Sequence, residues 1–151
     1  VEEFTDTTFQ PVIGDTEVNP GAVRQVLLCS GKIYYELENY RQEHGLFETA
    51  ILRLEQLYPV PRKSMGNWFK SFPGARRWRW VQEEPENMGG WQYVRHHLES
   101  VVGHPIAYVG RRASSTPATG FPWVSRTMPE AETRFLTTSC QPWSRESITF
   151  K

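Results

Sequence analysis

The sequence predicts a single α/β domain, with a mostly parallel sheet covered by helices on both faces in a three-layer arrangement. Short apolar or β-branched segments alternate with segments of helical periodicity, in the order strand, helix, strand, helix, strand, helix, strand. The first strand, Val26 to Cys29, is continuously apolar, as expected of a strand that is buried on both faces of a parallel sheet. The length of 151 residues fits one ordinary domain with its own core.

The chain divides into three predicted parts. Residues 1–22 form a lead-in segment rich in Thr, Asp, Pro and Gly, in which the apolar stretch 9–13 is suited to pairing at a sheet edge. Residues 23–122 form the α/β domain, and residues 123–151 form a divergent tail with little periodicity. Within the domain we expect strands over 26–29, 49–54, 78–81 and 105–109, and helices over 33–45, 61–72 and 88–101.

Two of these helices have readable faces and ends. In the first helix, Ile33 and Leu37 belong to one apolar face, whereas Arg41 is assigned to the polar remainder, and Gly45 ends the helix. In the second helix, Pro61 suits the start, Gly66 weakens the interior, and Pro73-Gly74 ends the helix.

The segment Arg79 to Trp91 organises the domain. It begins as a strand, and Pro85 is expected to stop strand pairing. Asn87 then offers a side-chain oxygen to cap the following helix. Because ligands and partners of open α/β sheets meet the carboxyl ends of the strands, we expect Glu83 and Glu84 to lie where function is concentrated.

The composition excludes several classes of protein. Seventeen basic and seventeen acidic residues cancel, which argues against nucleic acid or an anionic membrane as a partner. The basic and aromatic run 76–79 is better explained as one strand, with Arg77 and Arg79 on one face and Trp78 and Trp80 on the other. No apolar run is long enough for a membrane span, and the first residues lack the pattern of a signal peptide, so we expect a cytoplasmic protein or, in a eukaryote, one of the mitochondrial matrix.

Candidate chemical groups cluster at predicted strand ends. Ser30-Gly31-Lys32 lies between a strand and a helix, where it could hold a phosphate, but the spacing of a dinucleotide fingerprint or P-loop is missing and a tight turn is the better interpretation. Glu55, Glu83 and Glu84 each end a strand and could form an acid/base pair or a cation site, although caps and ion pairs are commoner roles.

Other reactive side chains point to binding more than to catalysis. Arg111 and Arg112 follow the last strand and are the best local candidates for binding an anion. His96 and His97 are adjacent on a helix and point about 100° apart, which disfavours a shared metal. Cys29 lies inside an apolar strand and is interpreted as a core residue, and neither a catalytic residue nor a metal site is predicted.

Four ordered blocks together resemble one known family. They are the segments 26–35 (Val-Leu-Leu-Cys-Ser-Gly-Lys-Ile-Tyr-Tyr), 53–59 (Arg-Leu-Glu-Gln-Leu-Tyr-Pro), 80–91 (Trp-Val-Gln-Glu-Glu-Pro-Glu-Asn-Met-Gly-Gly-Trp), and 108–111 (Tyr-Val-Gly-Arg) with 117–120 (Pro-Ala-Thr-Gly). The similarity covers roughly residues 9–121 and is to the carboxyl-terminal domain of the thiamine-dependent, decarboxylating component of the 2-oxoglutarate dehydrogenase complex.

The resemblance implies a transketolase-like carboxyl-terminal domain from a longer homodimeric enzyme. That enzyme uses thiamine diphosphate and magnesium to decarboxylate 2-oxoglutarate and passes the succinyl group to a lipoyl-bearing succinyltransferase. In the family the cofactor belongs to earlier domains, so no cofactor is expected on this chain. The terminal domain contributes dimer assembly and, in some members, an effector site for acetyl-CoA or AMP, which makes the strand-end residues interface or effector candidates: Ser30, Gly31, Lys32, Glu55, Glu83, Glu84, Asn87 and Arg111.

The resemblance fades after Gly120, since relatives finish with a helix carrying a His-x-x-Glu-Gln-like pattern that residues 123–151 lack. We interpret this tail as replacement sequence, for instance from a frameshift. The chain beginning at Val1 then has two interpretations. It is a fragment of the dehydrogenase that lacks the catalytic domains and is inactive alone, or it is a free-standing α/β regulatory module that binds an acyl-CoA or a nucleotide.

Overall fold

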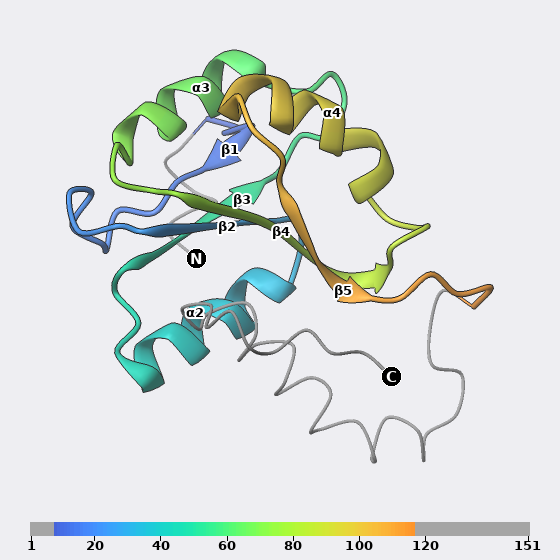
Figure 1. The fold of residues 1–151 in the computed structure, drawn as a ribbon, viewed down its shortest axis with the longest axis horizontal. Helices are drawn as coiled ribbons and strands as arrows, with labels where there is room; N and C mark the ends of the chain where they lie inside the picture. Colours follow the sequence, from blue (N-terminus) through green and yellow to red (C-terminus); the bar gives the residue numbers. More distant parts are fainter. Residues whose placement is uncertain (1–7, 117–151) are drawn as a thin grey trace.

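The computed structural model describes residues 8–116, which form a five-stranded sheet with three helices (Figure 1). The strand order is β1-β3-β2-β4-β5; β1 runs antiparallel to β3, and the other neighbours are parallel. The elements are β1 (Val12–Ile13), β2 (Gln25–Cys29), α2 (Ile33–His44), β3 (Thr49–Leu54), α3 (Arg62–Ser71), β4 (Arg77–Pro85), α4 (Trp91–Val102) and β5 (Ala107–Arg111).

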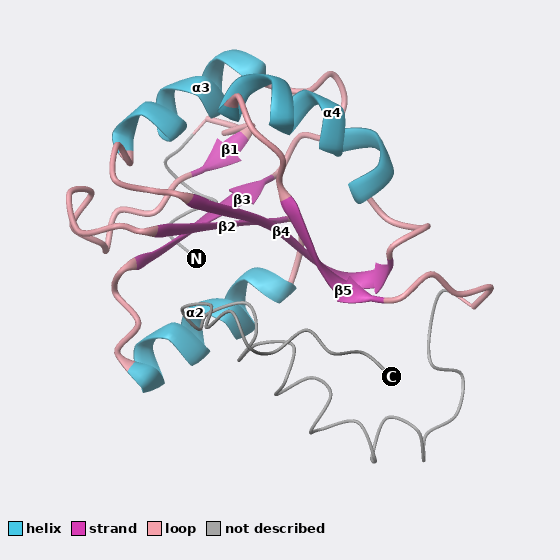
Figure 2. Cartoon of the chain, viewed as in Figure 1, coloured by secondary structure: helices cyan, strands magenta, loops and turns pink. Residues whose placement is uncertain are grey.

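The helices cover both faces of the sheet. Helix α2 lies on one face, and α3 and α4 lie side by side on the other (Figure 2). The predicted three-layer α/β fold with a mostly parallel sheet is therefore confirmed. The predicted edge strand within residues 9–13 is also confirmed, because Val12 pairs with Leu54 and Ile13 with Arg53.

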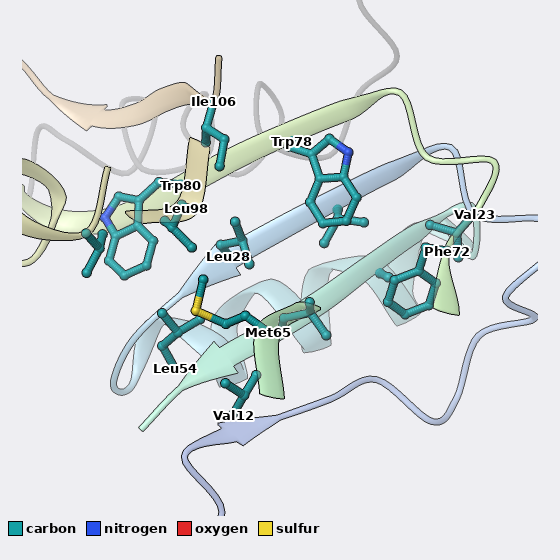
Figure 3. Packing of buried hydrophobic residues seen from close by; sticks show 14 of the residues in the cluster. Val12, Val23, Leu28, Leu54, Met65, Phe72, Trp78, Trp80, Leu98 and Ile106 are labelled. Carbon is teal, nitrogen blue, oxygen red and sulfur yellow. The ribbon is translucent and has the colours of Figure 1, made fainter. Parts of the chain in front are cut away.

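Two apolar cores fill the layers. The larger core lies between the sheet and α3 and α4, and in it Trp78 and Trp80 pack near Met65 and Leu98 (Figure 3). The smaller core joins α2 to the opposite face of the sheet. Since Trp78 and Trp80 both enter the larger core, the two-residue repeat predicted for this strand is confirmed.

Glycine ends two of the helices, and the sequence predicts the first of these ends, at Gly45. Gly45 follows α2 with φ of 64° and donates its N–H to the carbonyl oxygens of Arg41 and Gln42. Gly103 follows α4 with φ of 84° and donates to the carbonyl oxygen of Glu99. Residues with a β-carbon rarely adopt this left-handed conformation, so glycine fits both positions.

The segment after Val81 follows one prediction and departs from another. Strand β4 ends at Pro85, as expected, although Pro85 itself still pairs with Arg111 of β5 across an irregularity in register. The proline is tolerated because the pairing of β4 with β2 ends at Trp80, so no ladder bond is needed on that side. Helix α4 begins at Trp91 instead of residue 88, and no side chain caps it.

Part of the lead-in segment packs into the domain. Val12 and Val18 belong to the larger core. Asp15 is buried, and its carboxylate accepts hydrogen bonds from the Arg41 side chain and from the backbone N–H of Ile51, at 2.9 Å in the latter case. The carboxylate thereby continues the pairing of β3 beyond the point where β1 ends.

Candidate functional site at the carboxyl edge of the sheet

The candidate residues lie at one edge of the sheet. Because β2, β3, β4 and β5 are parallel, their carboxyl ends and the loops that follow share an edge (Figure 1). These loops and strand ends contain the predicted residues Ser30, Gly31, Lys32, Glu55, Glu83, Glu84, Asn87 and Arg111. We refer to this region as the carboxyl edge.

The turn after β2 makes an ion pair with β4. The Lys32 ammonium lies 2.9 Å from a carboxylate oxygen of Glu83 and 3.9 Å from one of Glu36. Gly31 has φ of 78°, which supports the interpretation of a tight turn that needs glycine. Since Lys32 is neutralised by carboxylates, this turn is poorly suited to holding a phosphate on its own. The exposed ion pairs are each worth less than about 1 kcal/mol.

Glu55 has a different partner from Glu83. Its carboxylate lies 2.7 Å from Nε of Arg53, whose guanidinium stacks over the rings of Tyr34 and Tyr35 at 4.6 and 5.3 Å from their centroids. Within residues 8–116 no group of His, Cys, Asp and Glu side chains is arranged to hold a metal ion. Glu55 and Glu83 are thus placed in separate ion pairs.

Asn87 joins two loops instead of capping a helix. Its amide donates to the carbonyl oxygen of Ser114 and its oxygen accepts from the N–H of Ser114, both at 3.0 Å. The predicted helix-capping role of Asn87 was therefore wrong, because a partner 27 residues later in the chain satisfies its side chain. This pair fixes the loop after β5 against the loop after β4.

Tyr108 ties the ends of β4 and β5 together. Its hydroxyl donates to the carbonyl oxygens of Glu84 and Arg111, at 2.9 and 3.0 Å. Burial raises the pKa of Tyr108 to about 12, and the carboxylates of Glu86 and Glu84 act in the same direction. The hydroxyl consequently stays protonated and keeps donating at neutral pH.

The pKa of Tyr108 makes a testable contribution to alkaline stability. Because the folded-state pKa, about 12, lies above the ordinary value of 10.0, the contribution is full below pH 10 and is lost as pH rises from there toward 12. Tyr108→Phe is expected to lower the free energy of unfolding at pH 7 by about 0.5–1.5 kcal/mol and to flatten the decline above pH 10. Urea unfolding at pH 7, 10 and 11 measures both effects. Tyr93→Phe is the control, and equal alkaline slopes for Tyr108→Phe and the parent chain would contradict the assignment.

Gln82 is a buried residue of this edge that sequence reasoning missed. Its side-chain oxygen accepts from Nε1 of Trp80 at 2.8 Å and from the N–H of Trp91 at 3.1 Å, and its amide donates to the carbonyl oxygens of Met88 and Pro85. A glutamine that interrupts the apolar residues of a strand was the available signal. Gln82 holds the turn that leads from β4 into α4.

Cys29 is not poised for nucleophilic chemistry. It is fully buried, and that burial raises the pKa of its thiol to about 12. The nearby Arg53 guanidinium lowers this pKa and the Glu55 carboxylate raises it, both by less than burial does. The thiol therefore remains protonated at neutral pH, in agreement with its interpretation as a core residue.

An exposed aromatic patch lies beside the predicted residues and was also missed. We define the aromatic patch as Tyr58, Tyr93, His97 and Arg62. Tyr58 is 80% exposed and Tyr93 42% exposed, with ring centroids 6.2 Å apart. Tyr93 lies edge-on to His97 at 5.3 Å, and Nη2 of Arg62 lies 2.5 Å from Nδ1 of His97. The patch connects the loop after β3 to the outer surfaces of α3 and α4.

Most of the chain matches the model of one known protein family. Residues 1–137 match the model of the 2-oxoglutarate dehydrogenase C-terminal family. The chain belongs to that family. The match confirms the resemblance drawn from the four sequence blocks, and it extends into the segment after Trp123, whose structure lies outside the described residues.

Curated relatives of this 2-oxoglutarate dehydrogenase C-terminal domain are much longer proteins. It is 44% identical over 116 residues to the 2-oxoglutarate dehydrogenase E1 component of Cupriavidus necator, which covers 75% of this chain and 12% of the relative. The 2-oxoglutarate dehydrogenase E1 component of Shouchella clausii is 37% identical over 123 residues, which cover 78% of this chain and 13% of the relative. The 2-oxoadipate dehydrogenase complex component E1 of Danio rerio is 40% identical over 116 residues, which cover 76% of this chain and 13% of the relative. The chain thus spans about one eighth of the length of these relatives.

A solved structure has the same fold. It is a split-gene transketolase, described as an inactive tetramer of four beta subunits. It matches with a TM-score of 0.52 and 14% sequence identity, and the match covers 90% of this chain and 45% of the transketolase chain. The likeness confirms the transketolase-like fold of this 2-oxoglutarate dehydrogenase C-terminal domain. Among the helices of residues 8–116, none has the length and apolar character needed to cross a membrane.

Proposed function

We propose that this chain is the non-catalytic assembly domain of a 2-oxoglutarate dehydrogenase E1 component. In this proposal the parent enzyme binds thiamine diphosphate and magnesium in earlier domains, decarboxylates 2-oxoglutarate and passes the succinyl group to the lipoyl carrier of a succinyltransferase. The family match supports the parent, since the chain spans only 12% of the Cupriavidus necator relative.

The observation on which the assembly role rests is the contrast between the paired charges and the exposed aromatics of the carboxyl edge. Glu83 and Glu55 are each engaged by a separate cation, whereas Tyr58 is 80% exposed next to Tyr93. Aromatic residues are enriched in the centres of protein interfaces. We therefore assign the aromatic patch to contact with a second copy of the chain in a homodimer.

The experiment uses the purified chain. We expect it to produce no turnover of 2-oxoglutarate with thiamine diphosphate and magnesium, and to dimerise in sedimentation equilibrium. Tyr58→Ser should raise the dimer dissociation constant at least about tenfold, because truncating a central aromatic costs 2 kcal/mol or more. Phe47→Ser is the matched control, since Phe47 is 52% exposed but precedes β3, at the opposite edge. Turnover by the chain, or equal dimerisation of the two variants, would refute the proposal.

Effector binding is the second part of the proposal. Arg111 ends β5 at the carboxyl edge and Arg112 follows it, close to the loop that Asn87 fixes through Ser114. Guanidinium groups in such a position suit the phosphates of acetyl-CoA or AMP. Calorimetric titration of the chain and of Arg111→Ala with each compound tests this part, and an unmodified chain that binds neither compound would remove it.

A free-standing regulatory module is the alternative. It would use the same edge for acyl-CoA or nucleotide binding but would belong to no larger enzyme. Reading the source gene upstream of Val1 separates the two proposals. Codons for thiamine-binding domains in the same frame would support the dehydrogenase, and an initiation codon directly before Val1 would support the module.

A further inference from the structure

A hollow lies at the edge of the sheet opposite the candidate site. It has a volume of about 460 Å³ and is lined by Arg24, Pro73, Gly74 and Arg76. Arg24 directly precedes β2 and Arg76 directly precedes β4, and these strands are parallel neighbours. The hollow is therefore at the amino edge of the sheet, away from the aromatic patch and from the loops that follow the strands.

Backbone hydrogen bonds fix the main chain of the two arginines side by side, and their side chains are exposed. The carbonyl oxygen of Arg24 accepts from the N–H groups of Arg76 and Arg77, at 3.0 and 3.3 Å, and its own N–H donates to the carbonyl oxygen of Glu48 at 2.8 Å. Nη1 of Arg24 also donates to the carbonyl oxygen of Gly21 at 3.2 Å. A guanidinium has five N–H donors, so most of those of Arg24 remain available to a ligand.

The arginines of the hollow differ from three other basic residues of the domain in their partners. Lys32, Arg41 and Arg53 each lie against a carboxylate. Neither Arg24 nor Arg76 forms an ion pair with any carboxylate of residues 8–116, and no acidic residue lines the hollow. Two positive charges thus face one concave surface in a chain whose formal net charge is zero.

Gly74, which lines the hollow, lies in close contact with the Arg24 side chain. A β-carbon at this position would come within 2.4 Å of Nη1 of Arg24 and 3.0 Å of the carbonyl oxygen of Val23. Any larger residue would displace the Arg24 guanidinium from its place over the glycine. Because Nη1 is the end of a flexible, exposed side chain, it can move aside, so Gly74→Ala is expected to fold and to shift the Arg24 guanidinium without altering the charge of the hollow.

We propose that this hollow binds a small molecule that carries a phosphate group. Planar guanidinium groups match phosphate oxygens in bidentate geometry, and two of them balance the nearly two negative charges of a phosphate monoester at neutral pH. The volume of 460 Å³ exceeds that of one oxyanion and lies within the range of small-molecule sites, and Pro73 supplies an apolar wall. The site is independent of the proposed assembly role and of the effector position at Arg111.

The test is calorimetric titration of the 151-residue chain with inorganic pyrophosphate, repeated with succinate as a dianion without phosphorus. We expect one pyrophosphate per chain and at least about tenfold weaker binding of succinate. Arg76→Ala should weaken pyrophosphate binding at least about tenfold, as expected for loss of a charge-assisted contact. Arg24→Ala should do the same, and either arginine variant suffices if the other does not fold.

Two further variants distinguish a built site from general attraction to positive charge. Lys63→Ala removes an exposed charge from α3 and should leave the affinity unchanged. Gly74→Ala keeps every charge and should weaken binding at least about tenfold, with circular dichroism confirming its fold. Absence of pyrophosphate binding to the unmodified chain, equal binding of succinate, or equal weakening by Lys63→Ala would overturn the proposal.

Discussion

Replacing Asp15 by alanine is expected to lower the free energy of unfolding by about 3–5 kcal/mol, the usual effect of breaking a buried ion pair by removing one partner. The side chains of Asp15 and Arg41 are 4% and 1% exposed, and their charged groups are in direct contact. Without the carboxylate, the Arg41 guanidinium keeps its burial and loses its closest negative charge. The N–H of Ile51 also loses its acceptor, at 2.9 Å, in the centre of the fold.

The remaining partners of Arg41 do not replace Asp15. Arg41 donates to the carbonyl oxygen of Thr49 at 3.3 Å and to the carboxylate of Glu17 at 3.1 Å, but the Glu17 side chain is 51% exposed. Exposed ion pairs are worth less than about 1 kcal/mol, so Glu17 supplies little of the stabilisation that Arg41 requires. Asp15 therefore provides the principal compensation for a charge placed between α2, β3 and the lead-in segment.

Urea unfolding at pH 7 measures the effect. Glu17→Ala is the matched control, because it removes a carboxylate from the same guanidinium at the surface, and we expect it to cost less than about 1 kcal/mol. Asp15→Asn separates the two functions of Asp15, since the amide oxygen can still accept from Ile51 but carries no charge. If Asp15→Ala were no more destabilising than Glu17→Ala, the buried pair would not have the importance assigned to it.

The sequence predicted elements whose signals are local. The apolar run ending at Cys29 and the alternation of Trp78 with Arg79 indicated strands of a parallel sheet, and parallel strands necessarily end at one edge. Gly45 indicated a helix end because few other residues adopt positive φ. The fold, and the edge on which Glu83 and Arg111 lie, followed from these signals.

Pairings between distant residues were not predictable in the same way. Arg41 was assigned to the polar side of its helix on its charge, yet it lies four residues after Leu37 and is buried because Asp15, 26 residues earlier, neutralises it. Asn87 fits the profile of a helix cap, but Ser114, 27 residues later, satisfies its side chain. Propensity describes what a side chain can do, whereas the tertiary partner decides what it does.

Replacing Gln82 by methionine is the second change with a large expected effect. Methionine is close to glutamine in length but provides no comparable hydrogen bonds, and Gln82 is only 3% exposed. Nε1 of Trp80 and the N–H of Trp91, which donate to the Gln82 oxygen at 2.8 and 3.1 Å, would lose their acceptor inside the larger core. Each unsatisfied buried group costs about 1–3 kcal/mol, so for two groups we expect a loss of about 2–6 kcal/mol.

The variants of Gln82 also test how the carboxyl edge is positioned. Gln82→Glu keeps an oxygen that accepts from Trp80 and Trp91 but loses the amide that donates to the carbonyl of Met88 at 2.7 Å. At low pH the carboxyl is protonated and can donate in place of the amide. The free energy of unfolding of Gln82→Glu, relative to the parent chain, should therefore be higher at low pH than at pH 7. Gln92→Met is the control, because Gln92 is exposed and makes one bond, to the carbonyl of Glu86 at 3.0 Å; we expect a change within about 0.5 kcal/mol. Urea unfolding measures all three variants, and hydrogen exchange of the Trp91 amide reports the turn itself. Full protection of that amide in Gln82→Met would show that Gln82 does not hold the start of α4, and that the edge depends on other contacts.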